Sequence, residues 1–248
     1  MLETRVIPVL LLKDNGLVKT EKFKKYRYVG DPINAIRIFN EKEVDELILL
    51  DLEANNSGKI NFNLIERITS ECFMPLCYGG GIQDIDTIRK ILALGVEKIA
   101  LNTFALNNLS FLKSAIEEFG SSTIVLSIDI KKNILGKYEI YTNGGKKKHS
   151  RSLEEVLISI EQLKVGEVLI NSIDKDGTQS GYDLKLIKKV SELITMPVVA
   201  CGGAGSIEDF KLGKENGASA LAAGSFFVFH GKFKAVLITY PERNKLKF

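Results

Sequence analysis

Two glycine-rich turns have the residue types and the spacing to bind the two ends of one ligand. Residues 75–81 (PLCYGGG) are repeated in similar form at residues 197–203 (PVVACGG), and Pro197 follows Pro75 by 122 positions. Each segment is a short apolar run that ends in glycine and leads into a helical pattern. Glycine lets backbone N–H groups approach an anion, and the N-terminus of the next helix favours negative charge. Two such turns predict a ligand with a phosphate at each end.

Polar residues end the next apolar run in each half of this repeat. Residues 95–103 end in an asparagine and a threonine, and their counterpart, residues 217–225, ends in a glycine and a serine. Together with the glycine turns they offer backbone N–H groups, an amide and hydroxyls to a phosphate. A single glycine turn is more simply a tight loop, so it is the pairing of the two sets that favours phosphate binding.

Aspartates at the ends of predicted strands are candidates for acid–base chemistry. Asp51, Asp129 and Asp176 hold such positions, and Asn171 and Gly177 belong to the same segment as Asp176. A carboxylate at the catalytic end of a barrel strand can move a proton, whereas the alternative is a helix cap or a hydrogen-bonded loop carboxylate. We favour catalysis for Asp129, and both interpretations stay open for Asp51 and Asp176.

The first strand breaks the symmetry of the repeat. Leu11 falls opposite Asp129 when the two halves are aligned, and a leucine cannot transfer a proton. The segment that follows, through Lys19 to Tyr26, is basic and aromatic. It is either a lid over an anionic substrate or a solvated surface loop. The basic cluster at 146–149 leaves a similar choice between steering of an anionic substrate and a solvated loop.

Four charged residues stand at the opposite ends of the predicted strands. Two cations and two anions there can form a ring across a barrel axis. One interpretation is a charge layer that stabilises the bottom of the barrel, and the other is a gate for a small neutral molecule. The four residues are Arg5, Glu46, Lys98 and Glu167.

Eight strands are needed to bring these residues together. Most of the apolar runs are continuous rather than alternating, as in strands that are buried on both faces. Helical patterns lie between many of them, for example over 85–94, 153–163 and 184–194. Eight strands with intervening helices predict an α/β fold, a TIM barrel, rather than an open doubly wound sheet. The expected strands are 6–12, 47–51, 74–78, 98–102, 123–129, 167–171, 197–201 and 218–222.

The spacing of the repeat predicts that the barrel consists of two half-barrels with four βα units each. Any barrel looks repetitive at about 30 residues per βα unit. The glycines, however, recur at an offset of about half of the chain, and repetition of single βα units alone does not account for that offset. We therefore expect a single (β/α)8-barrel domain over residues 1–248.

The bulk composition narrows the class of protein. The 248 residues include 34 basic and 31 acidic ones, and the net charge of +3 is too balanced to indicate a nucleic-acid or membrane partner. No apolar run approaches the roughly 18 residues of a membrane-spanning helix. The chain begins directly in a strand pattern, so we expect no signal peptide. Three cysteines without metal-ligand spacing indicate free thiols, and we expect a cytoplasmic protein with neither metal nor cofactor.

The sequence resembles the cyclase subunit of imidazole glycerol phosphate synthase, a carbon–nitrogen lyase of histidine biosynthesis. The resemblance extends from residue 5 to about residue 229 and implies a TIM barrel of two half-repeats. The matching stretches are GDP at 30–32, ELILLD at 46–51, GGGI at 79–82, NT at 102–103, SID at 127–129, SIDKDGT at 172–178, GYD at 181–183 and GGAG at 202–205.

The resemblance implies roles for residues that were already singled out. Asp129 would be one of two catalytic aspartates, Leu11 replaces the other, and Lys19 of the active-site loop is retained. The residues that would hold the two phosphates are Gly81, Asn102 and Thr103 for one, and Gly203, Gly224 and Ser225 for the other.

The resemblance also implies a partner. In the family a glutaminase subunit docks at the N-terminal face of the barrel, and ammonia travels through the barrel to the active site. The ring of Arg5, Glu46, Lys98 and Glu167 matches the family's ammonia gate. Because of this match, we favour an ammonia gate over a charge layer that only stabilises the barrel.

Two positions shift the expected function toward a paralogue of the cyclase. They are Leu11 and Cys201, the second at a position that serine often holds in the family. Such paralogues supply ammonia for amidination of surface-polysaccharide sugars, alongside a separate ATP-dependent amidotransferase. We therefore expect an ammonia-channelling synthase subunit that acts on a phosphorylated small-molecule substrate. The alternatives are a genuine histidine-pathway cyclase and a non-catalytic ammonia conduit or scaffold.

Overall fold

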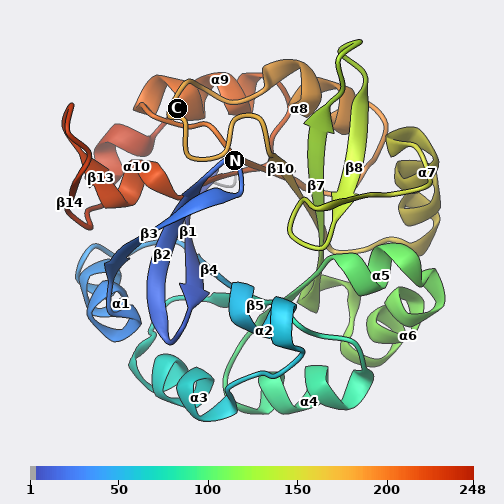
Figure 1. The fold of residues 1–248 in the computed structure, drawn as a ribbon, viewed down its shortest axis with the longest axis horizontal. Helices are drawn as coiled ribbons and strands as arrows, with labels where there is room; N and C mark the ends of the chain where they lie inside the picture. Colours follow the sequence, from blue (N-terminus) through green and yellow to red (C-terminus); the bar gives the residue numbers. More distant parts are fainter. Residues whose placement is uncertain (1–3) are drawn as a thin grey trace.

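The computed structural model describes residues 4–248 and shows a closed barrel of parallel strands (Figure 1). The circle closes where β12 pairs with β1 and Arg5 lies opposite Ala220. In order around the circle, the barrel strands are β1 (Arg5–Lys13), β4 (Leu47–Asp51), β5 (Leu76–Gly79), β6 (Lys98–Leu101), β7 (Ile124–Lys132), β10 (Glu167–Ser172), β11 (Val198–Cys201) and β12 (Ala220–Ala223). The predicted TIM barrel is confirmed, and each predicted strand is present with its ends shifted by up to three residues.

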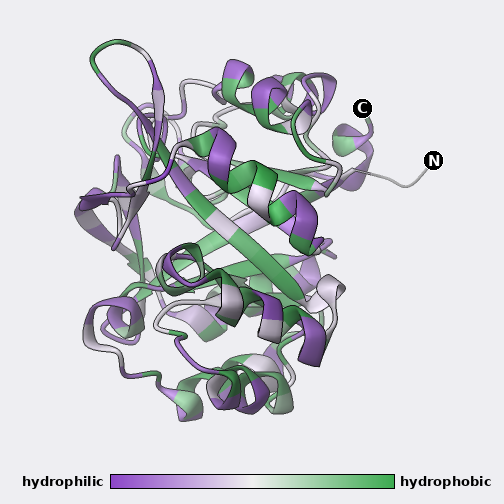
Figure 2. Cartoon of the chain, turned by 90° about the vertical axis from the view of Figure 1, so that its right-hand side faces the viewer, coloured by the Kyte–Doolittle hydropathy of each residue, from purple (hydrophilic) through white to green (hydrophobic). Residues whose placement is uncertain are grey.

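Helices between the strands cover the outside of the barrel. In α8, for example, Leu186, Ile187 and Val190 are buried, so one apolar stripe packs against the strands. Figure 2 shows apolar strands enclosed by helices whose outer surfaces are polar. The helices are α1 (Pro32–Glu41), α2 (Leu52–Ser57), α3 (Phe62–Glu71), α4 (Ile85–Ala93), α5 (Thr103–Asn107), α6 (Leu109–Phe119), α7 (Leu153–Leu163), α8 (Leu184–Ser191), α9 (Ile207–Glu215) and α10 (Ser225–Val228). The predicted helix over 153–163 matches α7, while α8 ends three residues earlier than predicted.

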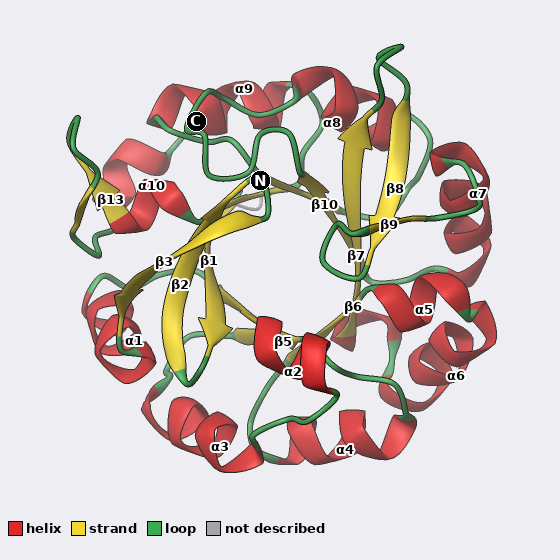
Figure 3. Cartoon of the chain, in the orientation of Figure 1, coloured by secondary structure: helices red, strands yellow, loops and turns green. Residues whose placement is uncertain are grey.

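Antiparallel hairpins extend beyond the barrel strands (Figure 3). The sequence predicted a loop after the first strand, whereas the structure has a hairpin there. The missed signal is Asp14 followed by Asn15, whose φ angles of 51° and 60° form the tight turn between β1 and β2. The additional strands are β2 (Gly16–Glu21) with β3 (Lys24–Gly30), β8 (Tyr138–Thr142) with β7 and β9 (Lys147–Lys148), and β13 (Phe229–His230) with β14 (Ala235–Val236).

The backbone at the two glycine turns shows that the two halves of the barrel are built alike. Asp84 and Ser206 lie 122 positions apart and cap α4 and α9, with φ/ψ angles of −147°/161° and −147°/164°. Each side chain accepts a hydrogen bond from the backbone N–H three residues later. Ser206 also forms the predicted capping box with Asp209. The sequence repeat is therefore a repeat of geometry.

The last βα unit departs from this pattern. After β12 the described chain forms the four-residue helix α10 and the β13–β14 hairpin, with no long outer helix. Aromatic rings fill this part of the outer layer, since the ring of Phe227 stacks 6.1 Å from Phe210 and 5.2 Å from Tyr240. The Tyr240 hydroxyl donates to the backbone oxygen of Val6 at 2.8 Å. A hairpin and packed aromatic rings thus stand where the repeat would place a helix.

The inside of the barrel is a separate apolar cluster. Among its buried members are Ile7, Ile48, Cys77 and Leu169, each contributed by a different strand. No helix within residues 4–248 is long and apolar enough to cross a membrane. The first three residues, on which the expected absence of a signal peptide partly depends, lie outside the described range.

Candidate active site

The C-terminal ends of the eight barrel strands surround a cavity of about 300 Å³, here called the mouth. Every barrel strand contributes a residue to its lining. The mouth brings together the predicted site residues Leu11, Lys19, Asp51, Gly81, Asn102, Thr103, Asp129, Asn171, Asp176, Gly177, Gly203, Gly224 and Ser225. The four charged residues of the predicted gate lie elsewhere.

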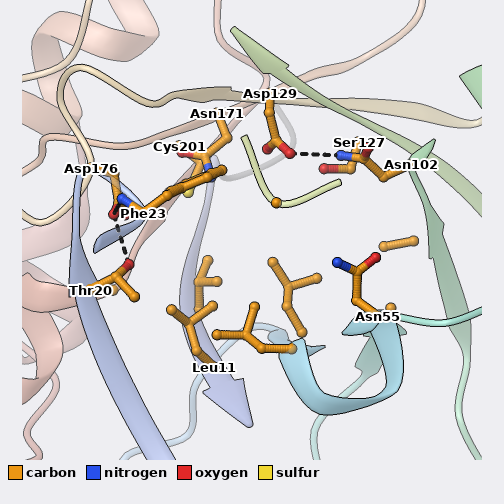
Figure 4. Close-up of a pocket in the computed structure, with 18 of the residues that line it drawn as sticks. Leu11, Thr20, Phe23, Asn55, Asn102, Ser127, Asp129, Asn171, Asp176 and Cys201 are labelled. Carbon is orange, nitrogen blue, oxygen red and sulfur yellow. Dashed lines mark hydrogen bonds between the residues drawn. The ribbon is translucent and has the colours of Figure 1, made fainter. Parts of the chain in front are cut away.

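One wall of the mouth is polar. Asp129, Asn171 and Cys201 are neighbours in register on β7, β10 and β11, and Figure 4 shows them on the same side of the cavity. The side-chain amide of Asn102 donates to Asp129 at 3.0 Å. Burial raises the pKa of Asp129 to about 7, although the Asn102 hydrogen bond lowers it. A carboxyl group that titrates near neutral pH is suited to accept and return a proton.

The opposite wall is apolar. Leu11 and Leu50 are neighbours in register on β1 and β4, and Val9 lies two residues before Leu11 on the same face of β1. All three line the mouth. Figure 4 shows Leu11 across the cavity from Asp129. This wall can contact apolar parts of a ligand, but its side chains cannot carry a proton.

Lys19 reaches from β2 into the mouth. Its ammonium group donates to the backbone oxygen of Val9 and is buried. A Cβ atom at Gly224 would collide with the Lys19 ammonium group, so the absent side chain makes room for it. Burial lowers the pKa of Lys19 to about 8, while the charge of Asp176 raises it. Lys19 therefore lies directly beside one of the glycines predicted to bind phosphate.

Asp176 holds the β2–β3 hairpin over the mouth. Its carboxylate accepts hydrogen bonds from the Thr20 hydroxyl at 2.8 Å and from the Phe23 backbone N–H at 3.2 Å. Its backbone oxygen accepts from the Lys22 N–H at 3.0 Å. A side chain at Gly177 would collide with the Thr20 carbonyl. Of the two interpretations that the sequence left open, the structure favours an anchoring carboxylate at position 176.

Asp51 also has a structural environment. One carboxylate oxygen caps α2 by accepting from the Ala54 N–H at 2.8 Å. The other accepts from the buried Tyr78 hydroxyl at 2.9 Å. Because both oxygens are engaged, the structure favours the helix cap over proton transfer for this residue.

The two predicted phosphate-binding sets lie at the mouth with their backbone turns in place. Gly81 and Gly203 have φ angles of 71° and 113°, which favour glycine, and they precede α4 and α9. Ser225 begins α10, and Thr103 begins α5. The Thr103 hydroxyl oxygen already accepts from the Asn143 N–H at 2.9 Å. Phosphate binding by these groups stays a prediction.

The predicted gate residues form a ring of ion pairs at the N-terminal end of the barrel. Arg5 donates to Glu46, and it donates to Glu167 at 2.6 Å. Lys98 donates to the same two carboxylates at 2.9 and 3.1 Å. Cations and anions alternate, so each carboxylate is shared by both cations. The ring crosses the barrel at the end opposite to the mouth.

Several residues of the mouth were missed at the level of sequence. Ser127 on β7, Asn55 in α2 and Asn143 in the turn after β8 line the cavity. The dipeptide Asn143-Gly144 was a turn signal that could have been used, and Ser127 begins the SID stretch that resembles the family, whereas nothing in the sequence marks Asn55. Within residues 4–248, no three His, Cys, Asp or Glu side chains are grouped so that they could hold a metal ion.

Comparison with known proteins identifies the family. The model of the histidine biosynthesis protein family matches residues 5–234. A Pseudomonas aeruginosa protein named "Putative imidazole glycerol phosphate synthase subunit hisF2" is 52% identical, and the match covers 99% of both chains. A Vibrio vulnificus protein named "Putative imidazole glycerol phosphate synthase subunit hisF3" is 47% identical, and the match covers 100% of this chain and 96% of the relative. The chain belongs to the HisF family.

A further relative has a lower identity. The imidazole glycerol phosphate synthase subunit HisF of Thermococcus onnurineus is 40% identical over 94% of this chain and 92% of its own. The family resemblance that the sequence motifs indicated is thereby confirmed.

Proposed function

We propose that this HisF-family chain receives ammonia from a glutaminase subunit and supplies it for amidination of a phosphorylated surface-polysaccharide sugar. The observation that carries the proposal is the asymmetry of the mouth, where Leu11 stands across from Asp129.

A single acid–base group suits ammonia transfer better than ring closure. Cyclisation to an imidazole moves several protons, and the family carries it out with two carboxylates. One positioned acid or base contributes about 10²–10⁴-fold to rate. With an apolar wall at Leu11 and Leu50, one carboxyl group, Asp129, faces the reacting atoms. Addition of ammonia to a carbonyl carbon needs one base for the proton that the nitrogen loses.

The interior of the barrel fits the passage of a neutral molecule. The strands enclose an apolar cluster between the ion-pair ring and the mouth. Ammonia enters such surroundings at far lower cost than ammonium, because burying an unpaired charge is expensive. A glutaminase docked at the end that carries Arg5 and Lys98 would release ammonia at the ring. The ring then acts as the entrance of the passage.

The chemistry of amidination sets what the partners must supply. An amide carbonyl oxygen is phosphorylated by ATP, ammonia adds to the carbon, and phosphate leaves with that oxygen, which gives an amidine, ADP and phosphate. In our proposal ATP is bound by a separate ATP-dependent amidotransferase. Asp129 takes up the proton that the attacking nitrogen loses, and the paired glycine turns at Gly81 and Gly203 hold the substrate phosphates.

An assay with the histidine-pathway substrate tests the proposal directly. The purified chain with ammonium salts is expected to form little imidazole glycerol phosphate, and its gene is expected not to rescue a histidine auxotroph that lacks the cyclase. Turnover comparable to that of a genuine cyclase, measured in the same assay, would overturn the proposal.

Lys98→Ala tests channelling. Removing this cation leaves Glu46 and Glu167 with Arg5 alone and opens the ring. In the complex with glutaminase, we expect the ratio of product formed to glutamine hydrolysed to fall several-fold, because ammonia escapes. The exposed Lys90 of α4 provides the matched control, Lys90→Ala. An unchanged ratio in Lys98→Ala would contradict channelling.

One observation favours a second candidate, a working cyclase of histidine biosynthesis. Lys19 and Asp129 both lie in the mouth with pKa values displaced to about 8 and about 7. Groups that titrate near neutral pH are typical of catalytic sites. The same assay with the histidine-pathway substrate separates the two candidates.

A further inference from the structure

Two sets of exposed apolar side chains flank the mouth. At the tip of the β7–β8 hairpin, Ile134 and Leu135 are 103% and 88% exposed. At the tip of the β13–β14 hairpin, Phe233 is 89% exposed, and Val236 and Leu237 after it are also exposed. Figure 1 shows the two hairpins at different sides of the barrel opening, and in Figure 2 the β7–β8 tip is the highest point of the molecule. Large exposed apolar residues at projecting positions mark interaction surfaces.

Hydrogen bonds hold the turn at the β7–β8 tip, and this turn does not need aliphatic residues. The Asn133 side chain accepts from the Leu135 N–H at 2.9 Å and from the Lys137 N–H at 3.0 Å. The Gly136 N–H donates to the Asn133 carbonyl at 2.9 Å. These bonds use Asn133 and backbone groups, so polar side chains at 134 and 135 would serve the turn equally well. The fold therefore gives no reason for Ile134 and Leu135.

The β13–β14 hairpin is fastened to the hairpin over the mouth. Lys234 pairs with Glu21 at 3.7 Å, and the Arg27 guanidinium lies 4.8 Å from the centre of the Phe229 ring. This hairpin occupies the outer position where the repeat would place the eighth helix. Its exposed Phe233 is consequently held near the rim of the mouth.

These two hairpins and the β2–β3 hairpin concentrate positive charge at the rim of the mouth. Residues 22–30, 131–148 and 229–236 contain four, six and two Lys or Arg residues, with Glu139 as their one carboxylate. The whole chain has a net charge of only +3, so the rest of it is net negative. Phosphates of a substrate account for basic residues at the mouth, but they do not account for apolar residues at the two tips. A protein surface that combines acidic residues with apolar pockets accounts for both features.

We propose that the separate ATP-dependent amidotransferase docks on this rim and covers the mouth, with acidic residues over the basic hairpins and apolar pockets around Ile134, Leu135 and Phe233. The inference rests on the proposed function. Ammonia that enters bulk water at neutral pH takes up a proton and ceases to be a nucleophile. In the proposed function the substrate and Asp129 lie in the mouth while the second enzyme holds ATP, so amidination requires that this enzyme seal the mouth against bulk water. Apolar anchors presented on rigid turns give such an interface affinity at low entropic cost.

Photo-crosslinking in the intact complex tests where the partner sits. The full chain, with p-benzoylphenylalanine at position 134, is expressed with its glutaminase in the native host and irradiated. The expected product is a crosslink to an enzyme that binds ATP and, once purified and combined with this chain, incorporates ¹⁵N from ammonium into a sugar. Position 158 gives the matched control, because Ile158 is 59% exposed on α7, on the outer side of the barrel. A crosslink from position 134 to glutaminase, to a second copy of this chain or to no protein would overturn the inference.

The second measurement is the affinity of this chain for the purified amidotransferase. The double substitution Ile134→Glu and Leu135→Glu is expected to weaken binding about tenfold or more, whereas Ile158→Glu binds as the unchanged chain does. Equal affinity of all three chains would overturn the inference. Failure of the proposed function looks different, because ¹⁵N from glutamine would then not reach the sugar even with the unchanged chain.

Discussion

The two walls of the mouth come from equivalent places in the two half-barrels, yet they differ in chemistry. The wall on β7, β10 and β11 carries Asp129, Asn171 and Cys201, whereas the wall on β1 and β4 carries Leu11 and Leu50. The backbones are alike, as the matching φ/ψ angles of the caps at Asp84 and Ser206 show. The repeat therefore preserves the binding scaffold independently of the acid–base side chains that the scaffold carries.

The electrostatics of Asp129 follow from its burial. Its carboxylate is withdrawn from water, so its pKa rises to about 7. A second carboxylate at position 11 would change the field that Asp129 feels. Substitutions at Asp129 and at Leu11 change one wall at a time.

The largest effect is expected for Asp129→Asn. This change keeps the size of the side chain and removes the only proton-accepting group that we assign to the reaction. We expect ammonia-dependent product formation to fall by about 10²–10⁴-fold in the assembled complex. The measurement is the rate of ¹⁵N incorporation with saturating ammonium. Unchanged incorporation would show that the barrel is a conduit without chemistry of its own.

Leu11→Asp restores the symmetry of the walls. A carboxyl group at position 11 stands across the cavity from Asp129, and a second acid–base group is worth on the order of 10²-fold. We expect formation of imidazole glycerol phosphate from the histidine-pathway substrate to rise by about this factor. Leu11→Asn is the matched control, since it has the same shape without the titrating proton. If both variants behave alike, position 11 does not decide between the two reactions.

The smallest effect concerns the stability of the chain as a function of pH. The pKa of Asp129 is raised on folding, so the folded chain binds more protons than the unfolded chain between about pH 4 and pH 7. The stabilisation is therefore fully present below pH 4 and is lost as pH rises to 7. Denaturant unfolding at pH 5 and pH 8 should show a larger loss of stability with rising pH for the unchanged chain than for Asp129→Asn. Equal losses would mean that the burial of Asp129 does not shift its pKa.

Much of the architecture could be predicted because it is local or repeated in the sequence. Continuous apolar runs gave the eight strands, and the glycine turns at 79–81 and 202–203 gave the ends of two of them. The hairpin β2–β3 was missed because β2 is mostly buried and β3 is mostly exposed, so neither strand shows an alternating pattern. The role of Asp176 could not be predicted, since its hydrogen-bond partners Thr20 and Phe23 are more than 150 positions away.

By itself the sequence determined the barrel, its two half-repeats, the family, and the leucine opposite Asp129. These follow from periodicity, spacing and residue type, which are properties of the chain alone. Only the tertiary structure decided which carboxylates are free to act. Asp51 and Asp176 are engaged by Ala54, Tyr78, Thr20 and Phe23, whereas Asp129 faces the cavity with a raised pKa. The physical reason is that hydrogen bonding and desolvation depend on groups that meet only when the barrel closes.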